Sequence, residues 1–272
     1  MTRAGDLVLP RIMGHRGAAA RAPENTLGGL RRAAELGATW VEIDVMLTGD
    51  DVPILHHDYN FARTCAHPAD VAATSSIIVA ELDAGAWFST EPGRRDWVGE
   101  VVPTLEQAVA ALCDFGLGLN LELKPTPGRD IETAKVTLDL LSRLWPSDRP
   151  SPLISSFSRA CLEVARDQVP QLPRGRLWEQ LPADWQADAE TLDCTSVHLW
   201  REPLTHAQAR AVKAAGYQLA VFTVNQSEEA ERFLEWDVDC LITDLPDRLL
   251  PIASPPPIQR PSPYSAAARE GA

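Results

Sequence analysis

Short apolar segments alternate with amphipathic segments along most of the chain, and this alternation constrains the fold more than any other feature. Eight apolar segments have the length of buried strands, and each is followed by a segment with helical periodicity. Alternating strands and helices are typical of parallel sheets. Eight such units close a (β/α)8 barrel, which occupies roughly 250 residues, and the chain has 272 residues.

The periodicity and the turn residues set the expected bounds. Thr104 and Thr205, each followed by a glutamine three residues later, predict capping boxes, and Gly37 and Gly216 predict helix ends. A doubly wound open sheet is the alternative, but the glycine-rich phosphate loop typical of its first turn is absent, so we predict an α/β TIM barrel. The predicted strands cover 11–15, 40–46, 117–123, 152–156, 175–179, 196–200, 218–224 and 240–243, and the predicted helices cover 26–36, 104–115, 129–145, 158–169, 181–193, 205–216 and 226–236, with a short helix after Asp247.

Two segments depart from the alternation. Residues 52–57 follow the second strand too closely for a parallel crossover, so we expect an antiparallel hairpin arm that places His57 roughly opposite Glu42. Residues 58–103 are too long for an ordinary loop and are expected to form a small insertion at the carboxyl-terminal face. We assign residues 1–252 to the barrel domain and 253–272, rich in Pro, Ser and Ala, to a disordered tail.

Composition excludes some partners. The chain has 25 Lys and Arg residues against 38 Asp and Glu residues, and this net charge of −13 argues against a nucleic-acid partner bound by a broad basic face. The same charge would also disfavour an anionic substrate, unless the site itself is locally different. No apolar stretch approaches the roughly 20 residues of a membrane span. Five scattered cysteines without a close pair and a start without a secretory signal predict a cytoplasmic protein.

Polar residues that can carry chemistry follow the first strands. The first strand ends in Gly14-His15-Arg16-Gly17, which offers an imidazole for proton transfer and a guanidinium for an anion, although a structural histidine is the alternative. Glu42 and Asp44 occupy positions i and i+2 of the second strand and share a face. They either lie on an exposed face or, if buried, need a compensating cation.

The third strand repeats this spacing with Glu122 and Lys124. The pair either supplies a third carboxylate for a metal with a cation beside it, or forms a simple salt bridge. The hairpin places His57 toward the carboxylates and leaves His56 as a structural residue, while His198 lies on a strand that could face the pocket. Oxygen ligands favour Mg²⁺ or Ca²⁺ over Zn²⁺. Two histidines beside such a metal suit general acid–base catalysis of phosphoryl transfer.

The run GHRGAAARAPENTLGGLRRAAELGATWVEIDVMLTGDDVPILHHD resembles the opening of the glycerophosphodiester phosphodiesterase family. The order HRG, PENT, E-x-D, HD and E-x-K matches that family, and Arg63-Thr64, FTVN and ITDLPDRL extend the similarity to about residues 11–250. The resemblance implies a TIM barrel that hydrolyses glycerophosphodiesters to sn-glycerol 3-phosphate and an alcohol with a divalent metal, Mg²⁺ first, with Ca²⁺ or Mn²⁺ as alternatives.

By position, the resemblance implies roles for several residues. Phe222 stands where the family often has tryptophan, and Trp87 with Phe88 either covers the pocket or packs within the insertion. Two alternatives remain beside hydrolysis, namely a lyase that stops at a cyclic phosphate and a non-catalytic binding protein. The implied acid–base pair is His15 and His57, the metal ligands are Glu42, Asp44 and Glu122, the phosphate contacts are Arg16 and Lys124, and the further pocket residues are Glu24, Asn25, Trp87, His198 and Phe222.

Overall fold

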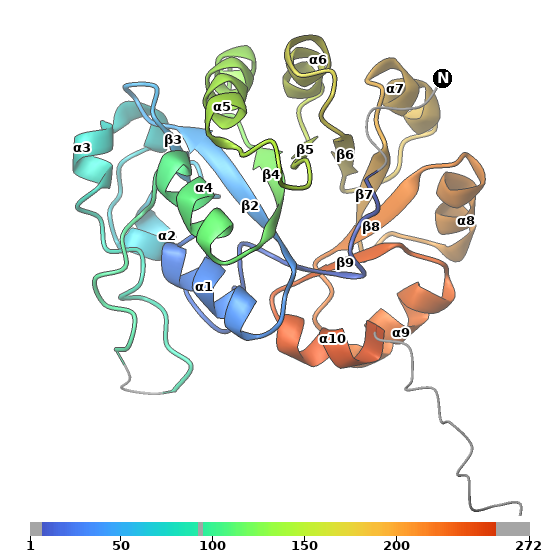
Figure 1. Cartoon of the computed structure of the whole chain (residues 1–272), viewed down its shortest axis with the longest axis horizontal. Coiled ribbons are helices and arrows are strands. Elements are labelled where there is room, and N and C mark those ends of the chain that lie inside the picture. The colour runs from blue at the N-terminus through green and yellow to red at the C-terminus, as the bar shows by residue number, and fades with distance from the viewer. Residues whose placement is uncertain (1–6, 92–94, 254–272) are drawn as a thin grey trace, which may run out of the picture.

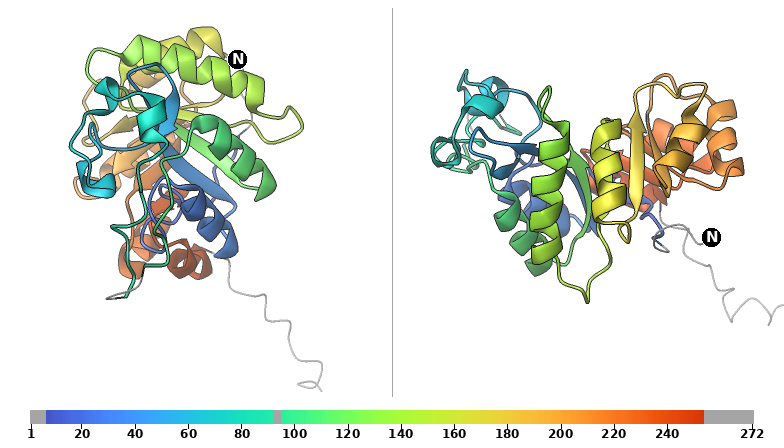
Figure 2. Two further views of the ribbon diagram at one scale, coloured as in Figure 1. Left: turned by 90° about the vertical axis from the view of Figure 1, so that its left-hand side faces the viewer. Right: turned by 90° about the horizontal axis from the view of Figure 1, so that it is seen from above.

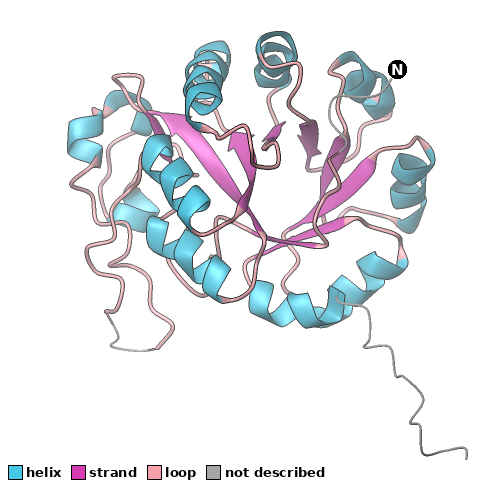
Figure 3. Ribbon diagram, viewed as in Figure 1, coloured by secondary structure: helices cyan, strands magenta, loops and turns pink. Residues whose placement is uncertain are grey.

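The computed structural model describes residues 7–91 and 95–253 and contains a closed barrel of eight parallel strands (Figures 1 and 3). The barrel closes because β1 pairs in parallel with both β9 and β2, which confirms the TIM-barrel prediction. The predicted tail lies outside the described residues from residue 254 onward. In barrel order the strands are β1 (Ile12–Gly14), β9 (Cys240–Thr243), β8 (Gln218–Phe222), β7 (Ser196–Trp200), β6 (Arg174–Trp178), β5 (Leu153–Ser156), β4 (Gly118–Leu123) and β2 (Trp40–Leu47).

Helices follow the strands and cover the outside of the barrel, as Figures 1 and 3 show. Thr104 and Thr205 form the predicted capping boxes, each through its side chain and a glutamine three residues later. Gly37 and Gly216 follow helix ends with φ values of 90° and 82°, which confirms those two ends. The helices are α1 (Leu27–Glu35), α4 (Leu105–Asp114), α5 (Asp130–Leu144), α6 (Arg159–Gln168), α7 (Trp185–Thr191), α8 (His206–Ala214), α9 (Ser227–Glu235) and α10 (Pro246–Ala253).

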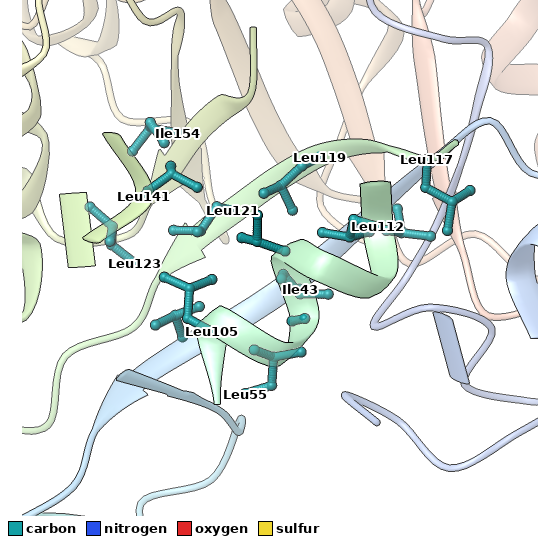
Figure 4. Packing of buried hydrophobic residues seen from close by; sticks show 14 of the residues in the cluster. Ile43, Leu55, Leu105, Leu112, Leu117, Leu119, Leu121, Leu123, Leu141 and Ile154 are labelled. Atoms are coloured by element: carbon teal, nitrogen blue, oxygen red, sulfur yellow. The ribbon is translucent and has the colours of Figure 1, made fainter. Parts of the chain in front are cut away.

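Two large apolar clusters lie between the helices and the strands. One joins β2, β4 and β5 to the first helices, and Ile43, Leu112 and Leu121 pack within it (Figure 4). The other covers β7 to β9 and includes Val197, Leu219 and Phe233. Because Ile43 packs outward in this core, its neighbours Glu42 and Asp44 point into the barrel. No helix in the described ranges is long and apolar enough to cross a membrane.

The insertion lies at one side of the barrel (Figure 2) and has its own small core around Phe61. It contains α2 (Ala62–Cys65), a 3₁₀ turn (Val71–Ala73) and α3 (Ser76–Val79), and it follows the antiparallel strand β3 (Pro53–Leu55).

The predicted hairpin exists, but its predicted register is wrong by one residue. Val45 lies opposite Leu55, so an extended pairing would put His57 opposite Ile43 rather than opposite Glu42. The strand ends at Leu55, short of the predicted end at residue 57, although one further backbone bond joins His56 N–H to Asp44 O (3.2 Å). His57 follows this bond, so its position depends on the chain after β3 as well as on strand pairing.

Candidate active site

A cavity of about 920 Å³ opens where the barrel strands end at their carboxyl sides. His15 follows β1, Glu122 and Lys124 lie at the end of β4, and Phe222 ends β8, and all four line this cavity. This face is where TIM barrels place their active sites, because the loops and strand ends there are free of the packing demands of the core.

Three carboxylates lie at one side of the cavity. Single oxygens of Glu42, Asp44 and Glu122 lie within 4.8 Å of one another, and all three residues are buried. Asp44 and Glu122 are direct neighbours across the β2–β4 ladder, so the strand register itself brings the acids together. Within the described residues, Oε1 of Glu42 and Oε1 of Glu122 have no hydrogen-bond donor. Buried oxygens in this state require a proton or a cation.

The protonation of these acids reflects their burial. Burial, with repulsion from Asp44 and Glu122, raises the pKa of Glu42 well above its usual value. Burial and the charge of Asp44 raise the pKa of Glu122 to about 7. Burial acts on Asp44 in the same direction, but the charges of Arg16 and Lys124 outweigh it and lower the pKa of Asp44. The oxygen-only donor set, in which two oxygens accept no hydrogen bond, fits a hard divalent cation such as Mg²⁺.

Arg16 connects the first strand to these acids. Its backbone N–H donates to Glu42 Oε2 (3.1 Å), its Nε lies 3.1 Å from Asp44 Oδ2, and its Nη1 donates to Glu24 Oε1 (2.8 Å). Burial would lower the pKa of Arg16, but Asp44, Glu24 and Glu42 raise it, so the guanidinium stays charged. Glu24 therefore orients Arg16.

Asn25 and Lys124 hold Asp44 from two other sides. Asn25 Nδ2 donates to Asp44 Oδ2 (2.9 Å), and Asn25 Oδ1 accepts from the Asp44 backbone N–H (3.2 Å). Lys124 Nζ lies 3.5 Å from Asp44 Oδ1 and 3.7 Å from Glu122 Oε1. Burial lowers the pKa of Lys124, but Asp44 and Glu122 raise it overall, so the lysine stays cationic at the cavity wall.

His15 is fixed by a carboxylate from the far end of the sequence. Its Nδ1 donates to Asp244 Oδ1 (2.6 Å), and its Nε2 lies 3.9 Å from Glu42 Oε2. Asn225 Nδ2 donates to Asp244 Oδ2 (2.6 Å), and Asn225 Oδ1 accepts from the Asp244 backbone N–H (2.9 Å). Although burial would raise the pKa of Asp244, the hydrogen bond and charge of His15 lower it. The imidazole is thereby held with Nε2 on the side of the acids.

His57 is fixed in a similar way by its sequence neighbour. Its Nδ1 donates to Asp58 Oδ1 (2.6 Å), and Arg63 Nε donates to Asp58 Oδ2 (2.7 Å). Arg63 also donates to both oxygens of Glu24, so a line of ion pairs joins His57 to Arg16. Burial lowers the pKa of His57 despite the opposing charge of Asp44, and this keeps the imidazole neutral near pH 7.

Other predicted pocket residues lie elsewhere. Trp87 packs within the insertion, since its Nε1 donates to Ala84 O (2.8 Å) and its ring meets Phe88 edge-on. His198 does not line the cavity, because it lies deeper in the barrel, fully buried, with Nε2 2.9 Å from Ser196 Oγ. The prediction of a pocket-facing His198 is therefore wrong. His56 is buried against Phe61 and is structural, as expected.

The sequence analysis did not identify Asp244 as the partner of His15, nor Asn225 as the residue that holds Asp244. Both residues follow an apolar barrel strand, and a polar residue in that place reaches the active-site face. Their position at this face could therefore have been predicted, but their hydrogen-bond partners could not. Arg63 was noted only as part of a motif, and its link between Asp58 and Glu24 depends on how the insertion folds.

Comparison with known proteins places this geometry in context. The sequence profile of the Glycerophosphoryl diester phosphodiesterase family matches residues 15–248. A Glycerophosphodiester phosphodiesterase of Bacillus subtilis is 30% identical over 259 residues, which are 89% of this chain and 87% of that protein. A protein with the same description from Caldanaerobacter subterraneus is 29% identical over 244 residues, covering 88% and 96% of the two chains.

A solved structure has the same fold. The Oleispira antarctica phosphodiesterase, determined in complex with the product sn-glycerol-3-phosphate, superposes with a TM-score of 0.86 at 36% identity. The match covers 90% of this chain and 98% of the other.

Proposed function

Because the chain belongs to the glycerophosphoryl diester phosphodiesterase family, we propose that it hydrolyses glycerophosphodiesters to sn-glycerol 3-phosphate and an alcohol in this cavity. The observation that carries the proposal is the convergence of two carboxylate-held imidazoles, His15 and His57, on a buried triad of acids. The product bound in the Oleispira antarctica phosphodiesterase supports the glycerol phosphate part of the substrate.

Glu42, Asp44 and Glu122 would hold a divalent metal, Mg²⁺ in the first instance, with Ca²⁺ and Mn²⁺ as alternatives to be compared. When bound, the metal supplies Lewis-acid stabilisation of the charge on the phosphoryl oxygens. Arg16 and Lys124 bind the same oxygens as fixed cations.

The charges of these groups explain how an acidic protein accepts an anion. When all three carboxylates are ionised, their negative charge exceeds the positive charge of Arg16 and Lys124 by one. A divalent cation reverses that sign, so the substrate's single negative charge meets a positive site. The net charge of −13 thus describes the whole chain and not the phosphate site.

We assign the proton transfers from the environments of the two imidazoles. His57, neutral near pH 7, accepts a proton at Nε2 from the attacking hydroxyl, which belongs to water or to the 2-hydroxyl of the glycerol. His15 donates a proton from Nε2 to the leaving alkoxide, while Asp244 stabilises its imidazolium through Nδ1. Each proton that enters one imidazole is balanced by one that leaves the other.

Phosphorus NMR of sn-glycero-3-phosphocholine with the protein and Mg²⁺ tests the proposal. We expect glycerol 3-phosphate to accumulate, and His15→Ala and His57→Ala to lower the rate by at least about 10²-fold. His206→Ala, an exposed histidine on α8, is the matched control and should keep the wild-type rate. A cyclic phosphate as the final product would identify a lyase, and tight binding without turnover would identify a binding protein. Either result contradicts the proposal.

A further inference from the structure

The part of the cavity opposite the acids has a different chemistry. In barrel order β7 is the strand farthest from β2, and its end contributes Trp200, Arg201 and Glu202 to the cavity lining. Phe157, after β5, and Phe222, at the end of β8, line the same part. The phosphate-binding groups therefore face a wall of aromatic rings.

The three rings form one surface. Trp200 and Phe222 are direct neighbours in the β7–β8 register, so their side chains share a face of the sheet. Phe157 meets Phe222 at right angles, with ring centroids 5.9 Å apart. Such a corner presents π faces in two directions, an arrangement that suits a rounded cation.

The ring of Trp200 is available to a ligand. Trp178, one strand away, already carries the guanidinium of Arg176 at 5.0 Å from its ring centroid. In the described ranges, 7–91 and 95–253, Trp200 has neither a ring partner nor a cation over its face. An indole that lines a cavity in this state is the strongest cation–π acceptor among the aromatic side chains.

The charges beside the rings are negative. Arg201 is held by both oxygens of Glu229 (2.9 and 3.0 Å) and by Glu202 (3.2 Å), so its charge is already compensated. Glu179, at the end of β6, also lines the cavity and makes no ion pair with the described residues. The aromatic wall therefore lies in a net negative region, although the phosphate site across the cavity is cationic.

We propose that this wall, formed by Phe157, Trp200 and Phe222 with Glu179 beside it, is the site for the alcohol group of the substrate and selects alcohols that carry an ammonium group. The inference rests on the proposed function and adds the substrate class to it. A zwitterionic diester places its phosphate on Arg16 and Lys124 and its ammonium on the aromatic and acidic side. Neutral alcohols gain no cation–π attraction there, and anionic ones are repelled by Glu179 and Glu202.

A pair of substrates with equal shape tests the selection directly. One is sn-glycero-3-phosphocholine, and the other is the 3,3-dimethylbutyl ester, in which a carbon atom replaces the charged nitrogen. The charged nitrogen also makes choline the better leaving group, so recognition of the cation is measured by how far variants of the wall change the ratio of the two kcat/KM values. We expect the choline ester to be preferred about tenfold by the wild-type protein.

Four variants test whether Glu179 and Trp200 cause that preference. Glu179→Gln and Trp200→Leu should each lower the ratio to about threefold or less, since each removes one attraction for the cation. Glu231→Gln changes the net charge equally on an exposed part of α9 outside the cavity lining and should keep the wild-type ratio. Trp200→Phe retains a π face and should restore part of the preference lost in Trp200→Leu.

The outcomes distinguish failure of the ammonium preference from failure of the proposed hydrolysis. A wild-type ratio near one, or a ratio that neither Glu179→Gln nor Trp200→Leu lowers, overturns the inference while glycerol 3-phosphate release continues. Absence of glycerol 3-phosphate from both esters refutes the proposed function and the inference with it.

Discussion

Replacing Asp244 with asparagine tests the positioning of His15 by the smallest change of shape. The carboxylate accepts from His15 Nδ1 through Oδ1 and from Asn225 Nδ2 through Oδ2. The orientation of Asn225 is fixed, because its Oδ1 accepts from the Asp244 backbone N–H and from Thr243 Oγ1. In Asp244→Asn the new amide oxygen would face Asn225, and the new NH₂ group would face His15.

This geometry sets the magnitude of the effect. Loss of one charge-assisted hydrogen bond corresponds to about 1.5–3 kcal/mol, or roughly 10- to 150-fold in kcat. The NH₂ group would also donate to Nδ1 and so hold the imidazole neutral, whereas the role of His15 as an acid requires the imidazolium. The same exchange in a serine protease triad, where the histidine acts first as a base, lowers kcat by about 10⁴-fold. We therefore expect kcat to fall between about 10²- and 10⁴-fold, with a much smaller change in KM.

Steady-state kinetics on sn-glycero-3-phosphocholine provide the assay. Asp247→Asn is the matched control, because Asp247 pairs with Arg21 on the surface three residues away and should retain wild-type kcat. Calorimetric titration of Mg²⁺ should give similar affinities for wild type and Asp244→Asn. A kcat for Asp244→Asn within about threefold of wild type would refute the role assigned to Asp244.

Three further predictions concern the acids and the ion pairs behind them. Glu122→Gln should abolish metal-dependent turnover, measured as glycerol 3-phosphate release, and a variant with wild-type turnover contradicts the ligand assignment. The same change should raise the thermal midpoint of the metal-free protein, because it removes a buried charge. Because the pKa values of Glu42 and Glu122 are raised in the folded state, these two groups keep protons in the metal-free protein that the unfolded chain releases near pH 4.5, and their contribution to stability should fall as the pH rises through about 7. The Mg²⁺-saturated protein should lack this contribution; calorimetry with and without Mg²⁺ across that range decides, and parallel curves would refute it. Arg63→Met breaks the ion pairs to Asp58 and Glu24 and should lower kcat about 3- to 30-fold, whereas Arg143→Met on exposed α5 should not; equal effects would show that the link is only structural.

Much of the fold was predictable because it depends on local patterns. The i and i+2 spacing of Glu42 and Asp44 around an apolar Ile43 was enough to place both acids on one face of a strand, but it left open whether that face was buried. The capping boxes at Thr104 and Thr205 likewise depend on residues three positions apart.

The remaining features depend on contacts that a local pattern does not contain. His15 meets Asp244 across 229 positions of sequence, and only closure of the barrel between β1 and β9 brings them together. The register of the β2–β3 hairpin depended on turn geometry, and a shift of one residue changed the expected partner of His57. His198 has the alternation of an inward residue, but its depth along β7 puts it below the cavity, two residues before Trp200.

We propose that turnover requires a divalent cation held by Glu42, Asp44 and Glu122, and a paired titration of bound metal and reaction rate decides whether it does. Protein freed of metal with EDTA would be titrated with Mg²⁺ while bound metal and the rate of glycerol 3-phosphate release are both recorded. We predict that one metal binds per chain, that the rate rises in proportion to occupancy, and that Glu42→Gln loses both. Full turnover by the chelated protein with no bound metal would contradict the claim.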